Sequence, residues 1–132
     1  MLYLDASALV KRYVDEDGSK LVRTAMAAES SWWICRIGFV ETVRAVELAA
    51  GPNAVRAVKR EWQFFGVVEV DAALTEHAAE LARSTELRSL DALHLAAALA
   101  LPDEDLTLAT WDTRLHAAAR DQGLHTLPEA LD

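Results

Sequence analysis

Short apolar runs alternate with longer, amphipathic stretches along the whole chain. We predict a strand over each apolar run: Leu2–Leu4, Trp32–Ile37, Val67–Val70, Leu106–Thr110 and His125–Leu127. The stretches between them predict helices: Ser7–Val14, Ser19–Ala28, Phe39–Ala50, Ala54–Phe65, Ala73–Ser84, Ser89–Leu101 and Arg114–Gln122. Gly38 and Gly66 are expected to separate a strand from a helix. Because the strands lack a clean two-residue alternation, this order is typical of a parallel sheet covered by helices on both faces.

The composition fits one folded domain over residues 1–132. The chain is 52% hydrophobic and 26% charged, which is typical of a globular protein. Its longest apolar stretch, around Leu90–Leu101, is too short to span a bilayer and contains Asp91 and His94, so we expect no membrane association. Cys35 is the only cysteine, which excludes a disulfide within the chain and favours a cytoplasmic location.

The formal net charge of −8 restricts how the protein can bind nucleic acid. Such a charge argues against binding through bulk positive charge alone. It does not exclude a nuclease whose acidic residues bind a metal, because the cation reverses the local sign.

Two acidic residues fall where strands of the predicted sheet end. Asp5 directly follows Leu2–Leu4, and Asp112 closely follows Leu106–Thr110. Ligands of open parallel sheets bind beyond the carboxyl ends of the strands. We therefore expect both carboxylates on the functional edge.

Two further acidic residues stand in apolar company at the starts of predicted helices. The residues four and seven positions after Asp91 are Leu95 and Ala98, and Glu41 shares a similar apolar stripe. A carboxylate on a buried helix face must be paired, protonated or metal-bound. A metal site is one of these outcomes.

Each acid alone also has a purely structural alternative. Asp5 and Asp112 suit turns, and Asp91 suits a first helical turn, where a negative charge contributes about 0.3–1 kcal/mol. Glu41 has Arg44 three residues on as an ion-pair partner. The placement of all four acids at strand ends and helix starts favours a shared site instead.

Clustered carboxylates have a chemical use, because Mg²⁺ and Mn²⁺ prefer oxygen ligands. A bound ion would acidify a water molecule and polarise a phosphoryl group. Ser7 and Thr110 lie two residues from Asp5 and Asp112, so their hydroxyls are candidates for orienting a carboxylate or a bound water. A cap or an ordinary strand position is the alternative for each hydroxyl.

Four stretches carry a resemblance to a known family: "YLDASALVKRY", "FVETVRAVELA", "LRSLDALHLAAAL" and "LATWDTRL". Together, in this order and at this chain length, they resemble the PIN-domain ribonucleases of the VapC type, the toxins of type II toxin–antitoxin pairs. The resemblance implies a three-layer α/β/α sandwich with a central, mainly parallel sheet of four to five strands. It implies a Mg²⁺- or Mn²⁺-dependent endoribonuclease with an RNA substrate, a VapB-like antitoxin, and a homodimer that assembles further with that antitoxin.

The resemblance also implies roles for single residues. The acidic quartet of the metal site would be Asp5, Glu41, Asp91 and Asp112. The hydroxyls of Ser7 and Thr110 would orient these ligands without binding the metal. Some relatives carry a further acid just after the last Asp, where this chain has Thr113 and Arg114. At these positions the chain departs from those relatives, in residues that would serve a second metal ion. Candidates for contact with RNA phosphates are Arg44, Arg88 and Arg114.

Two rival functions use similar residues. A phosphoacceptor domain would need an acidic pair near the first strand and a late lysine, but no lysine follows Lys59. A catalytically silent PIN-like interaction module is the stronger rival, although no member of the quartet is missing. His94 has no neighbouring His or Cys at zinc spacing, so we predict a packed or hydrogen-bonded core histidine. The helix Ala54–Phe65, with Trp62 and Phe65, is the expected dimer interface.

Overall fold

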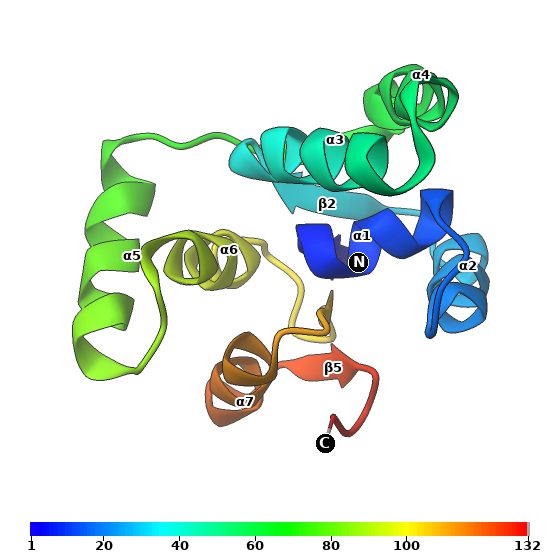
Figure 1. Cartoon of the computed structure of the whole chain (residues 1–132). Helices are drawn as coiled ribbons and strands as arrows, with labels where there is room; N and C mark the ends of the chain where they lie inside the picture. The colour runs from blue at the N-terminus through cyan, green and yellow to red at the C-terminus, as the bar shows by residue number, and fades with distance from the viewer. Residues whose placement is uncertain (132) are drawn as a thin grey trace.

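The computed structural model describes residues 1–131 and has five parallel strands in one sheet, in the order β3-β2-β1-β4-β5. The last residue of the expected domain lies outside the described range. The strands are β1 (Leu2–Leu4), β2 (Trp32–Cys35), β3 (Phe65–Val68), β4 (Thr107–Ala109) and β5 (His125–Leu127). The helices are α1 (Ala6–Tyr13), α2 (Ser19–Ala28), α3 (Ile37–Ala50), α4 (Pro52–Glu61), α5 (Ala72–Ser84), α6 (Ser89–Leu99) and α7 (Thr113–Asp121), with a 3₁₀ turn η1 (Trp62–Phe64). The predicted α/β class with a parallel sheet is confirmed (Figure 1).

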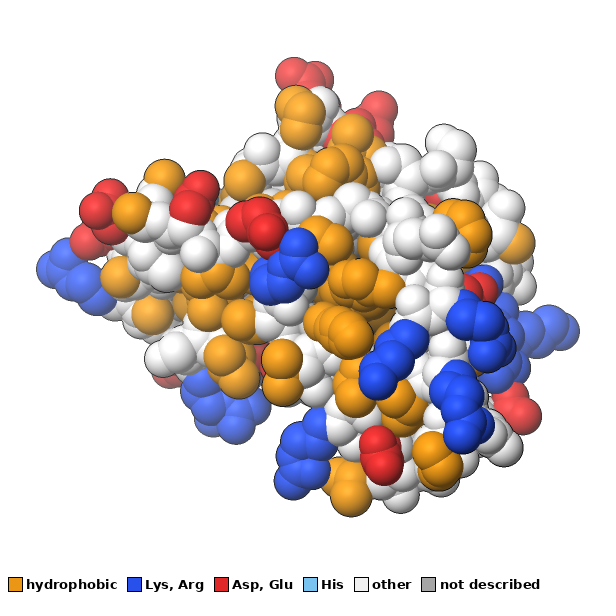
Figure 2. Space-filling model, turned by 90° about the horizontal axis from the view of Figure 1, so that it is seen from above, with side chains coloured by type: hydrophobic (Ala, Val, Ile, Leu, Met, Phe, Trp, Pro, Cys, Tyr) orange, Lys and Arg blue, Asp and Glu red, His pale blue; other side chains and the backbone are white. Residues whose placement is uncertain are grey.

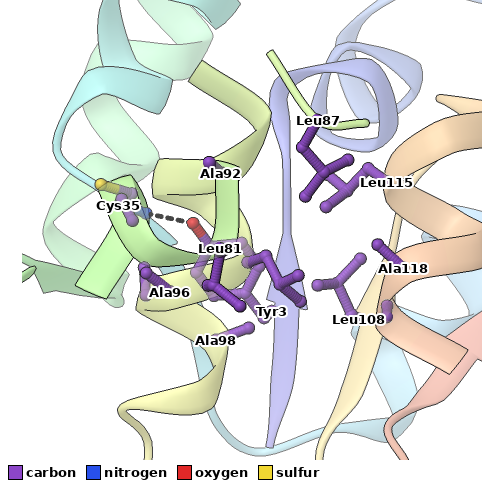
Figure 3. Packing of buried hydrophobic residues seen from close by; sticks show 14 of the residues in the cluster. Tyr3, Cys35, Leu81, Leu87, Ala92, Ala96, Ala98, Leu108, Leu115 and Ala118 are labelled. Carbon is purple, nitrogen blue, oxygen red and sulfur yellow. Dashed lines mark hydrogen bonds between the residues drawn. The ribbon is translucent and has the colours of Figure 1, made fainter. Parts of the chain in front are cut away.

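Helices cover both faces of the sheet, and alternation along β1 shows how. Leu2 and Leu4 pack with α1 and α2 on one face, where α3 and α4 complete the layer. Tyr3 points to the other face and packs with residues of α5, α6 and α7 (Figure 3). The result is a three-layer arrangement with a core on each side of the sheet. Among residues 1–131, no helix is long and apolar enough to cross a membrane.

Two glycines that we expected at breaks lie inside regular elements. Gly38 is in the first turn of α3, where an added Cβ would lie 2.4 Å from Cδ1 of Ile34. Gly66 is the second residue of β3, where an added Cβ would lie 2.5 Å from the indole of Trp33. Both glycines thus allow close packing rather than ending an element.

The predicted interface helix is also corrected. Helix α4 ends at Glu61, and Phe65 opens β3 with its side chain buried. The Phe65 ring belongs to the core, and the partly buried ring of Trp62 packs against it at 5.4 Å, centroid to centroid. Phe64 is the exposed aromatic of this segment, at 66%. Seen from the α3–α4 side, surface apolar groups lie beside a group of Lys and Arg side chains (Figure 2).

Candidate active site

Asp5 stands at the carboxyl end of β1, in the middle of the sheet, and is 4% exposed. Its Oδ1 accepts a hydrogen bond from the backbone N–H of Ala8 at 3.0 Å, which makes it the N-cap of α1. The same oxygen accepts the hydroxyl hydrogen of Ser7 at 2.7 Å. The cap and the candidate site are therefore the same carboxylate.

Thr110 connects Asp5 to the end of the neighbouring strand. Its buried hydroxyl donates to Oδ2 of Asp5 at 2.5 Å and accepts the backbone N–H of Asp112 at 3.1 Å. Ser7 completes the connection, because its Oγ accepts the N–H of Trp111 at 2.8 Å. Both hydroxyls that the sequence analysis selected thus contact Asp5 directly. This network joins the ends of β1 and β4, which pair side by side.

The second strand-end acid also caps a helix. Asp112 is the N-cap of α7, and its Oδ1 accepts the N–H of Leu115 at 2.9 Å. The other oxygen, Oδ2, lies 3.5 Å from Nη2 of Arg88. Capping therefore leaves one carboxylate oxygen of Asp112 directed toward the candidate site.

Burial shifts the protonation of Asp5. Removal from water raises the pKa of its carboxyl, and the nearby His94 ring and the donors Thr110, Ser7 and Ala8 oppose that rise. The net shift is upward, so the ionised form of Asp5 costs folding free energy near neutral pH.

Asp91 and Glu41 line a recess of about 470 Å³ at the starts of α6 and α3. Burial raises the pKa of Asp91 first, and repulsion from Asp112 raises it further. Asp5 adds to the same repulsion, whereas Arg88 opposes it. The carboxylate of Asp91, at the start of α6, therefore lies near those of Asp112 and Asp5 at the ends of β4 and β1.

The three candidate arginines take different places. Nε of Arg88 lies 3.7 Å from Oδ2 of Asp91, so its guanidinium stands between the carboxylates of Asp91 and Asp112. Arg44 on α3 and Arg114 on α7 are exposed. Arg88 thus pairs within the acidic site, and the other two arginines lie on its flanking helices.

Glu41 has a different partner from the one considered in the sequence. Its Oε1 lies 2.7 Å from Nε2 of His94, while Arg44 forms no ion pair with it among residues 1–131. On the other side of the ring, Nδ1 of His94 lies 2.7 Å from the hydroxyl of Tyr3. The prediction of a hydrogen-bonded core histidine is confirmed, but its contact with Glu41 was missed. The only available signal was that His94 follows Asp91 by one helical turn.

Known proteins share this fold and sequence. The PIN domain family profile matches residues 2–121. The chain belongs to the PIN domain family. Ribonuclease VapC45 of Mycobacterium tuberculosis (strain CDC 1551 / Oshkosh) is 37% identical to this PIN domain over 142 aligned positions, which cover 100% of this chain and 98% of the relative. Ribonuclease VapC46 of Mycobacterium tuberculosis (strain ATCC 25618 / H37Rv) is 33% identical, with 93% of each chain covered.

Solved structures agree on the PIN fold. A crystal structure of Mycobacterium tuberculosis VapC20, described as a Sarcin-Ricin loop cleaving toxin, gives a TM-score of 0.75 at 18% identity, covering 89% of this chain and 95% of that one. A toxin–antitoxin complex from Klebsiella pneumoniae gives 0.71 at 19% identity, covering 89% and 91%. These likenesses support the three-layer PIN-like architecture.

The donor chemistry of this PIN domain fits a hard divalent cation. The site offers carboxylate oxygens, and the repulsion that raises the pKa of Asp91 is what such a cation would relieve. Among residues 1–131, however, no three acidic, His or Cys side chains are close enough to share one ion. The guanidinium of Arg88 already supplies a positive charge at Asp91 and Asp112.

Proposed function

We propose that residues 1–132 form one PIN domain that acts as a metal-dependent endoribonuclease, the toxin of a toxin–antitoxin pair. The observation that carries this proposal is the placement of Asp5 and Asp112 at the ends of the paired strands β1 and β4, with Asp91 beside Asp112 on the same guanidinium of Arg88. The relatives named ribonuclease, which match along essentially the whole chain, support the same reaction.

In this proposal, Asp5, Glu41, Asp91 and Asp112 hold Mg²⁺ or Mn²⁺. One such ion supplies an acidified water and polarises the phosphoryl group when it is bound. Ser7 and Thr110 each donate to one oxygen of Asp5 and would orient that carboxylate toward the ion. Arg44, Arg114 and Arg88, once released from Asp91, orient the RNA backbone through its phosphates.

An antitoxin of the VapB type is the proposed inhibitor. Arg88 lies 3.7 Å from Asp91 and 3.5 Å from Asp112, so a guanidinium is compatible with this part of the site. We propose that an antitoxin Arg or Lys takes a similar place and blocks both the metal and the phosphate. Apolar residues of the antitoxin that pack on α1 and α2 of this protein would add affinity, because a charge pair alone barely offsets the cost of removing its charges from water. Homodimerisation is proposed as well.

A cleavage assay with matched variants tests the proposal. The purified full chain, freed of any partner, should cut a structured RNA in Mn²⁺ or Mg²⁺ and stop in excess chelator. Asp112→Asn should abolish cleavage while the protein stays folded by circular dichroism. Asp71→Asn is the control, because Asp71 caps α5 through the N–H of Leu74 at 2.8 Å just as Asp112 caps α7. The control should keep full activity.

The rival silent module makes the opposite prediction. A chain that binds a partner but cuts no RNA in either metal would favour a catalytically silent PIN module. Equal cleavage by wild type and Asp112→Asn would remove the acidic site from the mechanism.

A further inference from the structure

A buried chain of hydrogen bonds ends on Glu41. The backbone N–H of Cys35 donates to the hydroxyl of Tyr3 at 3.0 Å, a contact drawn in Figure 3. The Tyr3 hydroxyl lies 2.7 Å from Nδ1 of His94, and Nε2 of His94 lies 2.7 Å from Oε1 of Glu41. The chain therefore crosses from β2 through β1 and α6 to α3.

The groups on either side of the ring determine which nitrogen of His94 carries hydrogen. The Tyr3 oxygen already accepts the N–H of Cys35, and among residues 1–131 its own hydrogen has no acceptor other than Nδ1 of His94. Nδ1 therefore accepts, and Nε2 donates its hydrogen to Glu41.

The packing around the ring leaves it little freedom. The His94 side chain is 2% exposed, and its ring meets the ring of Tyr3 edge to face at 5.8 Å. Gly38 contributes from α3, because a Cβ there would lie 3.4 Å from Cε1 of His94. Glu41 itself is 30% exposed and lines the recess that also holds Asp91. A buried donor with little freedom thus holds one oxygen of a partly exposed carboxylate.

We propose that His94, oriented by Tyr3, is a positioning residue that fixes Oε1 of Glu41 and leaves Oε2 to bind the metal. The role rests on the proposed metal-dependent function. Asp91 precedes His94 by one turn of α6, so a single helix supplies one carboxylate of the site and the donor that orients another. Mutation of a partner that orients a metal ligand typically costs about 10–100-fold in metal affinity or activity.

Calorimetric titration of the purified full chain with Mn²⁺ tests this role. His94→Leu should weaken Mn²⁺ binding by about 10–100-fold. His94→Gln should bind nearly as well as wild type, because its amide nitrogen takes the place of Nε2. His116→Gln is the control, because His116 is also buried but Nε2 of its ring bonds the carbonyl of Pro128 at 2.7 Å. This variant should bind Mn²⁺ with the affinity of the wild type.

Nitrogen NMR of the metal-free protein gives a second readout that needs no metal. Wild type should show His94 as the single tautomer with hydrogen on Nε2, and Tyr3→Phe should lose that preference and weaken Mn²⁺ binding. If His94→Leu does not fold, Tyr3→Phe decides the question, because it removes only the hydroxyl.

Three results would overturn the proposal. A hydrogen on Nδ1 in the wild-type protein would reverse the direction of the hydrogen bonds that His94 makes with Tyr3 and Glu41. The Mn²⁺ affinity could also stay unchanged in folded His94→Leu, or in Tyr3→Phe together with an unchanged tautomer. Either result would make His94 an ordinary core residue without affecting the proposed nuclease function. A wild-type chain that binds no Mn²⁺ would refute the proposed function itself, and the positioning role with it.

Discussion

Replacing Thr110 by Val should destabilise the metal-free protein, chiefly through two of the hydrogen bonds that its hydroxyl makes. Val has nearly the same shape, so the change removes the hydroxyl that donates to Asp5 and accepts from the N–H of Asp112. A hydrogen bond to a charged group contributes about 1.5–3 kcal/mol, and an orphaned buried donor costs about 1–3 kcal/mol. Protonation of Asp5 and hydration of the Asp112 N–H limit the loss. We expect a total of about 2–4 kcal/mol near neutral pH.

The chain contains a matched control for this change. The hydroxyl of Thr42 on α3 is fully buried and has no hydrogen-bond partner among residues 1–131. Thr42→Val removes a buried polar atom that gains nothing, so it should leave stability unchanged or raise it by about 1 kcal/mol. The same chemical substitution is therefore expected to destabilise the protein at one buried site and not at the other.

Urea unfolding in excess chelator measures both variants. The penalty of Thr110→Val should shrink as the pH falls through the folded-state pKa of Asp5. Burial raises this pKa and loss of the Thr110 donor raises it further, and a protonated carboxyl needs the donor less. Equal unfolding free energies for Thr110→Val and Thr42→Val at neutral pH would refute the reasoning. A penalty that does not change with pH would show that the bond to Asp5 is not its source.

Four further outcomes are expected. Burial and Asp112 raise the folded-state pKa of Asp91, so the metal-free protein should lose stability as the pH rises from the ordinary Asp value of about 3.9 through that raised pKa. Asp91→Asn should flatten this fall and raise the melting temperature, and an unchanged pH profile in the variant would contradict the reasoning. Mn²⁺ at a hundredfold excess over its Kd should stabilise the fold by about 2.7 kcal/mol, and calorimetric melting should show that Asp112→Asn reduces this gain but Asp71→Asn does not. Gly66→Ala should cost about 1–3 kcal/mol in urea unfolding, because its Cβ would overlap the rigid indole of Trp33; wild-type stability would show that the indole moves freely. Changing the antitoxin's blocking Arg or Lys to Ala should restore RNA cleavage more than it weakens the complex, as measured by calorimetry; fully suppressed cleavage would mean that inhibition covers the RNA-binding surface instead.

The sequence by itself determined the order and type of the elements and the edge at which the acids gather. β1 and α2 begin and end at the predicted residues, because short apolar runs and amphipathic stretches are local signals. Asp5 and Asp112 were placed at the carboxyl edge by counting from strand ends alone, since all strands of a parallel sheet end on the same side.

Tertiary packing decided what local signals describe poorly. Glycine is a local signal for a break, but Gly38 and Gly66 lie inside a helix and a strand, where the close approach of Ile34 and Trp33 leaves no room for a Cβ. Similarly, the helical pattern of the sequence runs on through Trp62 to Phe65, but Phe65 is the first residue of β3. Its side chain is buried there, and this burial favours the strand over a longer helix.

The partners of the acidic residues could come only from the folded structure. Thr110 bonds Asp5 across 105 positions, and Tyr3 bonds His94 across 91. No local propensity carries information about such pairs, because they form only when β1, β4, α3 and α6 pack together. The sequence therefore named the carboxylates of the site, and the tertiary structure determined which oxygen of each one is already occupied and by which donor.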